Sequence, residues 1–156
     1  DEQLAHLESA PFLRRLDLSD TSITGTGLQH LRREAGSEFP LGLERLVLLE
    51  SLILNGTSLT DEELKHVAKI KSLKRLGLAR TQITDDGLAF LAGLEQLEEL
   101  ELSGTKVSDA GLSRFLTLTN LKRLGLRDTE VTEQGVEKLT ELPRLSDIRW
   151  KSKYTD

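Results

Sequence analysis

Groups of neighbouring carboxylates are the first candidates for chemistry in this sequence, because a pair of Asp or Glu side chains can hydrolyse a glycosidic bond. Such groups occur at residues 61–63, 85–86 and 98–101. The first two stand where helices are expected to begin, and helix capping explains them. In the third, Glu99 and Glu101 project from one face of a strand, but no aromatic side chains that could stack on a sugar accompany them. We therefore predict no glycosidase site.

The three histidines, His6, His30 and His66, occupy the same position in three repeats of the sequence. A zinc ion binds histidine nitrogens at about 2 Å, whereas neighbouring helices pack about 8–10 Å apart. Histidines on successive helices are therefore too far apart to share one ion. The chain also contains no cysteine that could supply a thiolate ligand or nucleophile. We predict neither a metal site nor a cofactor.

A threonine recurs at Thr21, Thr57, Thr81, Thr105 and Thr129. A threonine nucleophile needs a nearby base, and no such base recurs beside these residues. We predict instead that their hydroxyl groups satisfy polar backbone groups at turns. The segment Gly25-Thr26-Gly27 stands where later repeats have Asp-x-Gly, and no lysine of a phosphate-binding loop follows it. The sequence thus predicts no catalytic residues, and we expect that the chain is not an enzyme.

The leucines follow a fixed spacing and make up more than half of the hydrophobic residues. The second leucine of each Leu-x-x-Leu-x-Leu block recurs every 24 residues, except that the first interval is 12 residues longer. This spacing indicates a repeat protein whose units stack on one another to bury their leucines. The positions are Leu16, Leu52, Leu76, Leu100, Leu124 and, with a substitution, Ile148.

Each unit changes its hydrophobic period once. In one unit Leu76 and Leu78 are two residues apart, as in a short strand, whereas Leu88 and Leu91 are about one turn apart, as in a short helix. Between the two segments stands a residue that can cap the helix, followed by an acidic residue that the helix dipole favours. The caps are Thr60, Thr84, Ser108 and Thr132, and Glu63 gives the first of them a capping-box pattern.

These units resemble leucine-rich repeats over nearly the whole chain, from Leu13 to Trp150. The recurring segment Thr-x-[Ile/Val]-[Ser/Thr]-[Asp/Glu]-x-Gly-[Leu/Val] is similar to the cysteine-containing subclass, with Thr in place of Cys or Asn. It is also similar to repeats abundant in bacteria, planctomycetes especially. The resemblance implies an α/β solenoid: a curved horseshoe segment with a parallel sheet on its concave face and short helices on its convex face. It further implies a protein-binding role without shared catalytic residues.

The pattern predicts one leucine-rich-repeat domain over residues 1–156. Its first repeat, residues 1–12, is partial, because this segment aligns with the helical part of the next unit. An insertion falls within about residues 32–48, and its role is left open. Residues 145–156 are expected to form a C-terminal strand cap, in which Trp150 closes the open end of the core.

Charge and hydropathy argue against two classes of partner. The formal net charge is −5, which counts against a general nucleic-acid binder. The longest apolar run, Leu88–Ala92, is far shorter than the roughly 20 residues that span a bilayer. We therefore expect no nucleic acid as a partner and no membrane insertion, and the sequence does not indicate a compartment.

The strand residues that point away from the core are the candidates for binding. Arginines recur among them, and arginine can bind a carboxylate bidentately. We expect Gly77 and Gly125 to leave room beside these arginines for a partner side chain, and the strand glutamates to hold the arginines by ion pairing. The predicted binding residues are Arg75, Arg80, Glu99, Glu101, Arg123, Arg127, Arg149 and Lys151.

These residues predict a non-catalytic module that recognises a protein partner with acidic groups, mainly through the concave sheet face. Two alternatives stay open. The chain could be a repeat domain that positions or regulates a catalytic module elsewhere in a longer protein, which a partial first repeat would fit. It could also be a structural or oligomerising segment that uses its open ends.

Overall fold

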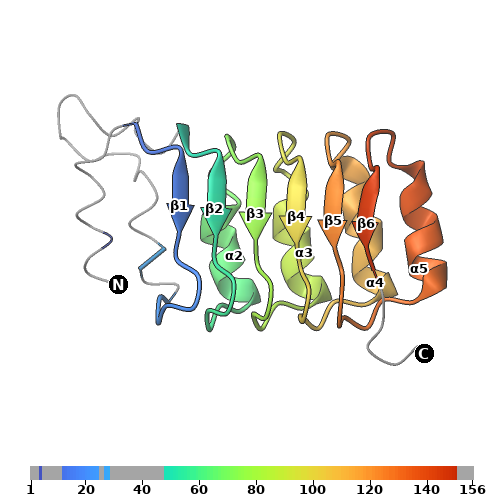
Figure 1. Cartoon of the computed structure of the whole chain (residues 1–156), viewed down its shortest axis with the longest axis horizontal. Coiled ribbons are helices and arrows are strands. Elements are labelled where there is room, and N and C mark those ends of the chain that lie inside the picture. Colours follow the sequence, from blue (N-terminus) through green and yellow to red (C-terminus); the bar gives the residue numbers. More distant parts are fainter. Residues whose placement is uncertain (1–3, 5–11, 25–26, 29–47, 151–156) are drawn as a thin grey trace.

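The computed structural model describes residue 4 and residues 12–24, 27–28 and 48–150. Within these residues, six strands form one parallel sheet whose order follows the sequence. Figure 1 shows the strands side by side, with the helices behind them. The strands are β1 (Arg15–Asp17), β2 (Ser51–Ile53), β3 (Arg75–Gly77), β4 (Glu99–Glu101), β5 (Arg123–Gly125) and β6 (Asp147–Arg149).

Short helices connect successive strands from β2 onward and cover one face of the sheet (Figure 1). None of the helices in the described ranges is long and apolar enough to cross a membrane. Most of the partial first repeat, nearly all of the 32–48 insertion and the chain beyond Trp150 lie outside the described residues. The helices are α2 (Asp61–Val67), α3 (Asp85–Leu91), α4 (Asp109–Leu112), η3 (Ser113–Thr117), α5 (Glu133–Lys138) and η4 (Leu139–Glu141).

The repeated leucines form the core, as the spacing predicts. Leu52, Leu76, Leu100, Leu124 and Ile148 are paired in register from β2 to β6. The four leucines of this row are at most 2% exposed. Stacking equivalent leucines between the sheet and the helices removes them from water, which a single strand–helix unit could not do.

The recurring threonines close the turn after each of the strands β1 to β5. The hydroxyl group of Thr81 donates a hydrogen bond of 2.6 Å to the backbone carbonyl of Leu78, three residues earlier. Thr21, Thr57, Thr105 and Thr129 make the same bond. The structural role predicted for these hydroxyl groups is therefore confirmed.

The predicted positions of the helix caps are confirmed, since Thr60, Thr84, Ser108 and Thr132 are the N-cap residues of α2 to α5. The side chains of Thr84 and Ser108 accept a hydrogen bond from a backbone N–H of the helix and Thr60 forms a capping box with Glu63, whereas the side chain of Thr132 makes no cap hydrogen bond. The aspartates that follow the caps have an additional role that the sequence analysis missed. Asp85 accepts a 2.8 Å hydrogen bond from the backbone N–H of Ser108 and another from its hydroxyl group. Asp61 binds Thr84, and Asp109 binds Thr132, in the same way. These carboxylates thus connect each repeat to the next.

This connection explains the glycine in the first turn of α3, α4 and α5. A Cβ atom at Gly87, Gly111 or Gly135 would collide with the aspartate carboxylate of the preceding repeat. The equivalent position in α2 is Glu63, and the aspartate position of the preceding repeat is occupied by Gly25. Glu63 instead accepts hydrogen bonds from the N–H (2.8 Å) and hydroxyl group (2.6 Å) of Thr60 in its own repeat.

Trp150 packs against the hydrophobic core. Its side chain is partly buried against the hydrophobic cluster. The indole Nε1–H donates a 3.0 Å hydrogen bond to the backbone carbonyl of Val131. The aromatic ring and this bond together fix the last described residue to the final repeat.

Candidate functional site

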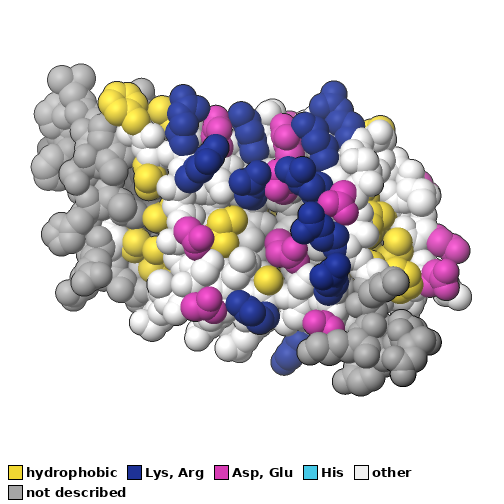
Figure 2. Space-filling model, in the orientation of Figure 1, with side chains coloured by type: hydrophobic (Ala, Val, Ile, Leu, Met, Phe, Trp, Pro, Cys, Tyr) yellow, Lys and Arg dark blue, Asp and Glu magenta, His cyan; other side chains and the backbone are white. Residues whose placement is uncertain are grey.

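The sheet face opposite the helices, here called the open face, carries rows of charged side chains. Figure 2 shows basic and acidic groups intermixed on this face, with a column of basic groups toward its C-terminal half. The row at the first strand position alternates in sign from β3 to β6: Arg75, Glu99, Arg123 and Asp147 are paired in register. Because parallel strands lie about 4.8 Å apart, long side chains in such a row can reach one another.

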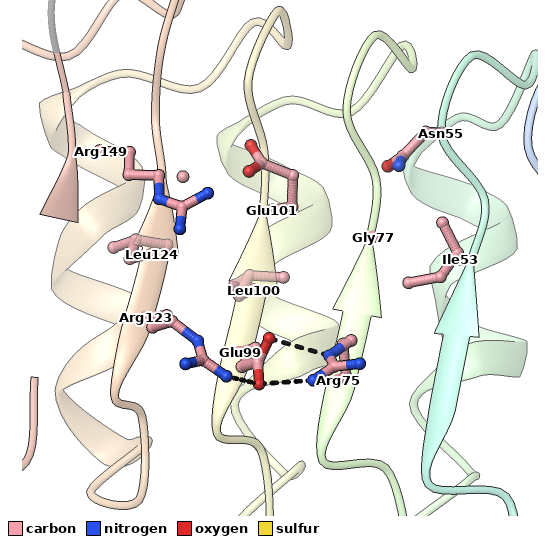
Figure 3. Close-up of a pocket in the computed structure, with 11 residues that line it drawn as sticks. Ile53, Asn55, Arg75, Gly77, Glu99, Leu100, Glu101, Arg123, Leu124 and Arg149 are labelled. Carbon is pink, nitrogen blue, oxygen red and sulfur yellow. Dashed lines mark hydrogen bonds and ion pairs between the residues drawn. The ribbon is translucent and has the colours of Figure 1, made fainter. Parts of the chain in front are cut away.

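The centre of this row is one carboxylate shared by two guanidinium groups. Arg75 donates to Glu99 through Nε and Nη2, and both bonds are 2.8 Å long. Arg123 donates to the same carboxylate from the other side, through Nη2 alone. Figure 3 shows the two guanidinium groups flanking Glu99. We call Arg75, Glu99 and Arg123 the arginine–glutamate cluster. Its formation confirms the ion pairing expected for Glu99.

The cluster changes the protonation of its central residue. The hydrogen bonds from Arg75, reinforced by Arg123, lower the pKa of Glu99 from its usual 4.5 to about 2, against the opposing effect of partial burial. Glu99 is thus ionised at neutral pH. Two positive charges and one negative charge leave the cluster with a net positive charge.

A second charged row stands one residue before the strands. Glu50 accepts hydrogen bonds from Arg14 (2.8 Å) and Lys74 (3.2 Å), and Glu98 accepts one from Lys122 (2.7 Å). The hydrogen bond from Lys122 lowers the pKa of Glu98. The sequence analysis did not single out this row, although the alternation of charge at 24-residue intervals could have revealed it.

The open face is hollowed over β2 to β6 by a small cavity of about 130 Å³. Ile53 contributes an apolar side chain to its lining and Asn55 a polar one, and charged groups of both signs surround it (Figure 3). Leu100 and Leu124 also border it, but both are almost fully buried in the core. Three arginines line the cavity against two glutamates, so its walls carry an excess of positive charge. The charged lining residues are Arg75, Arg123, Arg149, Glu99 and Glu101.

One expected ion pair is absent. Glu101 was predicted to hold neighbouring arginines, but it makes no ion pair within the described ranges and accepts hydrogen bonds from Ser103 instead. Ser103 is two residues further along the same chain segment, so this local bond needs no reach across the sheet. The prediction of ion pairing was therefore wrong for Glu101 and right for Glu99.

The expected space beside the two strand glycines is also partly filled. Gly77 and Gly125 are buried rather than exposed. The side chains of Ile53 and Asn55 lean over Gly77, and the carboxylate of Glu101 leans over Gly125. Side chains of the preceding repeat therefore fill most of the space beside the two glycines. The cavity is the part of that space that remains empty.

The structure describes three of the four remaining predicted residues. Arg149 lines the cavity, and its Nε contacts Asp147 at 3.3 Å. Arg80 is mostly exposed, lies 3.5 Å from Asp20 and has a φ of 54°, a left-handed conformation that costs a non-glycine residue energy. Arg127 is exposed and makes no ion pair with any residue that the structure describes. Lys151 lies outside the described residues.

The chemistry available on the open face is that of anion recognition. Guanidinium groups bind carboxylates and phosphates through several donors at once. Within the described ranges, no three His, Asp or Glu side chains come close enough together to hold a metal ion.

Comparison with known proteins agrees with this architecture. Residues 9–31, 69–92 and 96–116 match the Leucine Rich repeat family. An internalin C2 from Listeria monocytogenes has a TM-score of 0.51 at 23% identity, over 99% of this chain and 87% of that one. The C-terminal domain of a tropomodulin from Caenorhabditis elegans has a TM-score of 0.64 at 14% identity, over 92% and 91% of the respective chains. No curated protein matches the sequence.

Leucine-rich-repeat domains are generally protein-interaction modules and are typically non-catalytic, and no catalytic family matches this chain. At these identities the two solved structures show the fold alone. Together with the matched repeats and the six-stranded parallel sheet, they show that the chain is a leucine-rich-repeat solenoid.

Proposed function

We propose that the chain is a non-catalytic module that binds a protein partner mainly through the open face, the concave side expected of such a solenoid. The proposal takes residues 1–156 as one repeat domain. The observation that carries it is the arginine–glutamate cluster beside a small cavity with an excess of positive charge. The proposed contact residues are Arg75, Arg80, Glu99, Glu101, Arg123, Arg127, Arg149 and Lys151.

The cavity has features typical of an interaction centre. Ile53 contributes an apolar side chain to it beside the charged groups, and binding energy in protein interfaces concentrates where arginine or aromatic anchors meet desolvated apolar pockets. The sheet provides a continuous surface on which a partner can contact several repeats at once. Surface charge pairs such as those around Glu99 are worth only about 0–1 kcal/mol each, so a partner can rearrange them at little cost.

The charge of the site favours a partner with acidic groups. Positive side chains outnumber negative ones around the cavity, and Arg127, two residues beyond Gly125, adds an exposed guanidinium group. A partner carboxylate would gain charge-assisted hydrogen bonds there. A basic partner would be repelled by the three arginines of the cavity.

Selection from a random peptide display library on the immobilised full chain tests this proposal. Charge reversal by Arg123→Glu with Arg127→Glu should remove capture of the selected peptides and leave the melting temperature nearly unchanged. The matched control reverses two exposed lysines of the helix face, Lys65 and Lys138. Loss of capture in the helix-face variant with capture kept in the arginine variant would place binding on the convex side and refute the proposal.

A further inference from the structure

The two arginines of the arginine–glutamate cluster are held unequally. Arg75 engages both carboxylate oxygens of Glu99 through two donors. Arg123 contributes one donor, and it binds the oxygen that Arg75 Nη2 already contacts. Arg123 is therefore the arginine that Glu99 can release while its bidentate pair with Arg75 stays intact.

Arg123 also faces the cavity together with Arg149. Both residues line it, and Figure 3 shows their guanidinium groups on either side of Leu124. Arg149 is held by a single long contact, 3.3 Å from its Nε to Asp147. Each of these two guanidinium groups is thus held through a single donor, that of Arg123 to Glu99 and that of Arg149 to Asp147.

We propose, on the basis of the function above, that the partner contributes an extended acidic segment whose carboxylates, two residues apart, bind Arg123 and Arg149. The first of these carboxylates replaces Glu99 on Arg123. Glu99 then acts as an internal competitor that sets the affinity of the site. No covalent step is involved, and one ion pair is exchanged for another.

The distance between the two arginines determines how far apart the two carboxylates of the ligand must be. Arg149 is two residues beyond Asp147, the residue in register with Arg123 on the neighbouring strand. Strands about 4.8 Å apart and a rise of about 3.3 Å per residue put the two Cα atoms about 8 Å apart. In an extended peptide, side chains at positions i and i+2 point to the same side about 7 Å apart, whereas those at i and i+1 point to opposite sides. The flexible arginine side chains can cover the remaining difference.

Fluorescence anisotropy with labelled nonapeptides tests the ligand. Peptides with Glu-Ala-Glu, Glu-Glu-Ala or Gln-Ala-Gln at their centre, flanked by Gly-Ser-Gly on both sides, are titrated with the full chain. The Glu-Ala-Glu peptide should bind about fivefold more tightly than Glu-Glu-Ala, and Arg149→Gln should remove this preference. Equal binding of the two acidic peptides would overturn the proposed spacing. A phosphoserine peptide that binds far more tightly than either would overturn the assignment of the ligand as a carboxylate.

The competitor role is tested by Glu99→Gln against Glu98→Gln. Each substitution removes one negative charge, and the two residues are adjacent in the chain. Glu99→Gln breaks the ion pair with Arg123 on β5, and Glu98→Gln breaks the ion pair with Lys122, just before β5. Glu99→Gln should tighten binding of the Glu-Ala-Glu peptide about fivefold, and Glu98→Gln less than twofold. Equal tightening by both would show a general charge effect, and no tightening by Glu99→Gln would show that Glu99 is not displaced. Either result would overturn the inference, as would a lack of binding to both the wild type and the Glu99→Gln variant.

The outcome of this experiment can be distinguished from that of the test of the proposed function. If the library-selected peptides are lost with Arg123→Glu and Arg127→Glu, but Glu99→Gln does not tighten binding of the acidic peptide, the open face is still the binding surface. Only the exchange at Arg123 would then be refuted.

Discussion

The carboxylate of Asp85 accepts hydrogen bonds from both the backbone N–H and the hydroxyl group of Ser108, which caps the helix of the next repeat. The negative charge of Asp85 thus stabilises the start of its own helix, and its hydrogen bonds connect this repeat to the following one. In a solenoid each repeat contacts only its neighbours, so bonds of this kind determine how strongly the units are coupled.

Replacement of Asp85 should uncouple two repeats. Asp85→Ala leaves the part-buried N–H and hydroxyl group of Ser108 without this acceptor, and we expect the free energy of unfolding to fall by about 1–3 kcal/mol. Asp86→Ala is the matched control, because Asp86 occupies the same first turn but is exposed. Denaturant titration measures both. Equal losses would mean that the helix dipole, and not the bond to Ser108, accounts for the effect.

The glycine that faces this carboxylate should be intolerant of a side chain. A Cβ atom at Gly111 would collide with Asp85, and overpacking of this kind typically costs about 1–3 kcal/mol. The cost of Gly111→Ala should shrink in the Asp85→Ala background, because the colliding oxygens are gone. A double-mutant cycle measures this coupling. Additive effects of the two substitutions would contradict the proposed contact.

Loss of the terminal tryptophan should loosen one end of the solenoid. Trp150→Ala removes partly buried aromatic surface and the hydrogen bond to Val131. We expect faster hydrogen exchange in residues 121–145, while exchange in β3 and β4 stays slow. Phe12→Ala, at an aromatic residue that is 79% exposed, serves as the control and should change little. Unchanged exchange in the last repeats of the Trp150 variant would exclude the capping role.

Acid should weaken the protein partly through Glu99. Its pKa is lowered from 4.5 to about 2 in the folded state, so its contribution to stability is complete above the unfolded-state pKa and is lost as the pH falls through the folded-state value. Between pH 4.5 and 2 the melting temperature of the wild type should therefore fall more steeply than that of Glu99→Gln. Parallel pH profiles of the two proteins would show that the arginine contacts do not stabilise the ionised carboxylate.

Most of the fold was predictable because one period recurs in the sequence. The 24-residue spacing of leucine and threonine places equivalent residues of successive repeats beside one another, and the register from Leu52 to Ile148 confirms this. The Asp85–Ser108 bond was not predicted, because a local reading of the helix start already explains the aspartate by capping. The one sign of this contact in the sequence is Gly111 itself, because any larger residue there would collide with the carboxylate of Asp85.

The candidate site was predictable in position but only partly in its contacts. Alternation along each strand placed Arg75, Glu99 and Arg123 on one face, and their neighbouring positions made the ion pairs predictable. The partner of Glu101 could not be inferred from charge alone, because the hydroxyl and N–H groups of Ser103 compete locally with distant guanidinium groups. The side chains that lean over Gly77 depend on rotamers, which a repeat pattern does not specify.

Chemical-shift mapping tests the central claim, that the open face is the recognition surface, most directly. The ¹⁵N-labelled full chain is titrated with a peptide selected from the display library, and perturbations are assigned to backbone amides. We predict that the largest perturbations fall in β3 to β6, centred on residues 99–101 and 123–125, with little change in α2, α3 and α5. Perturbations concentrated in those helices, with the strand amides unchanged, would contradict the account.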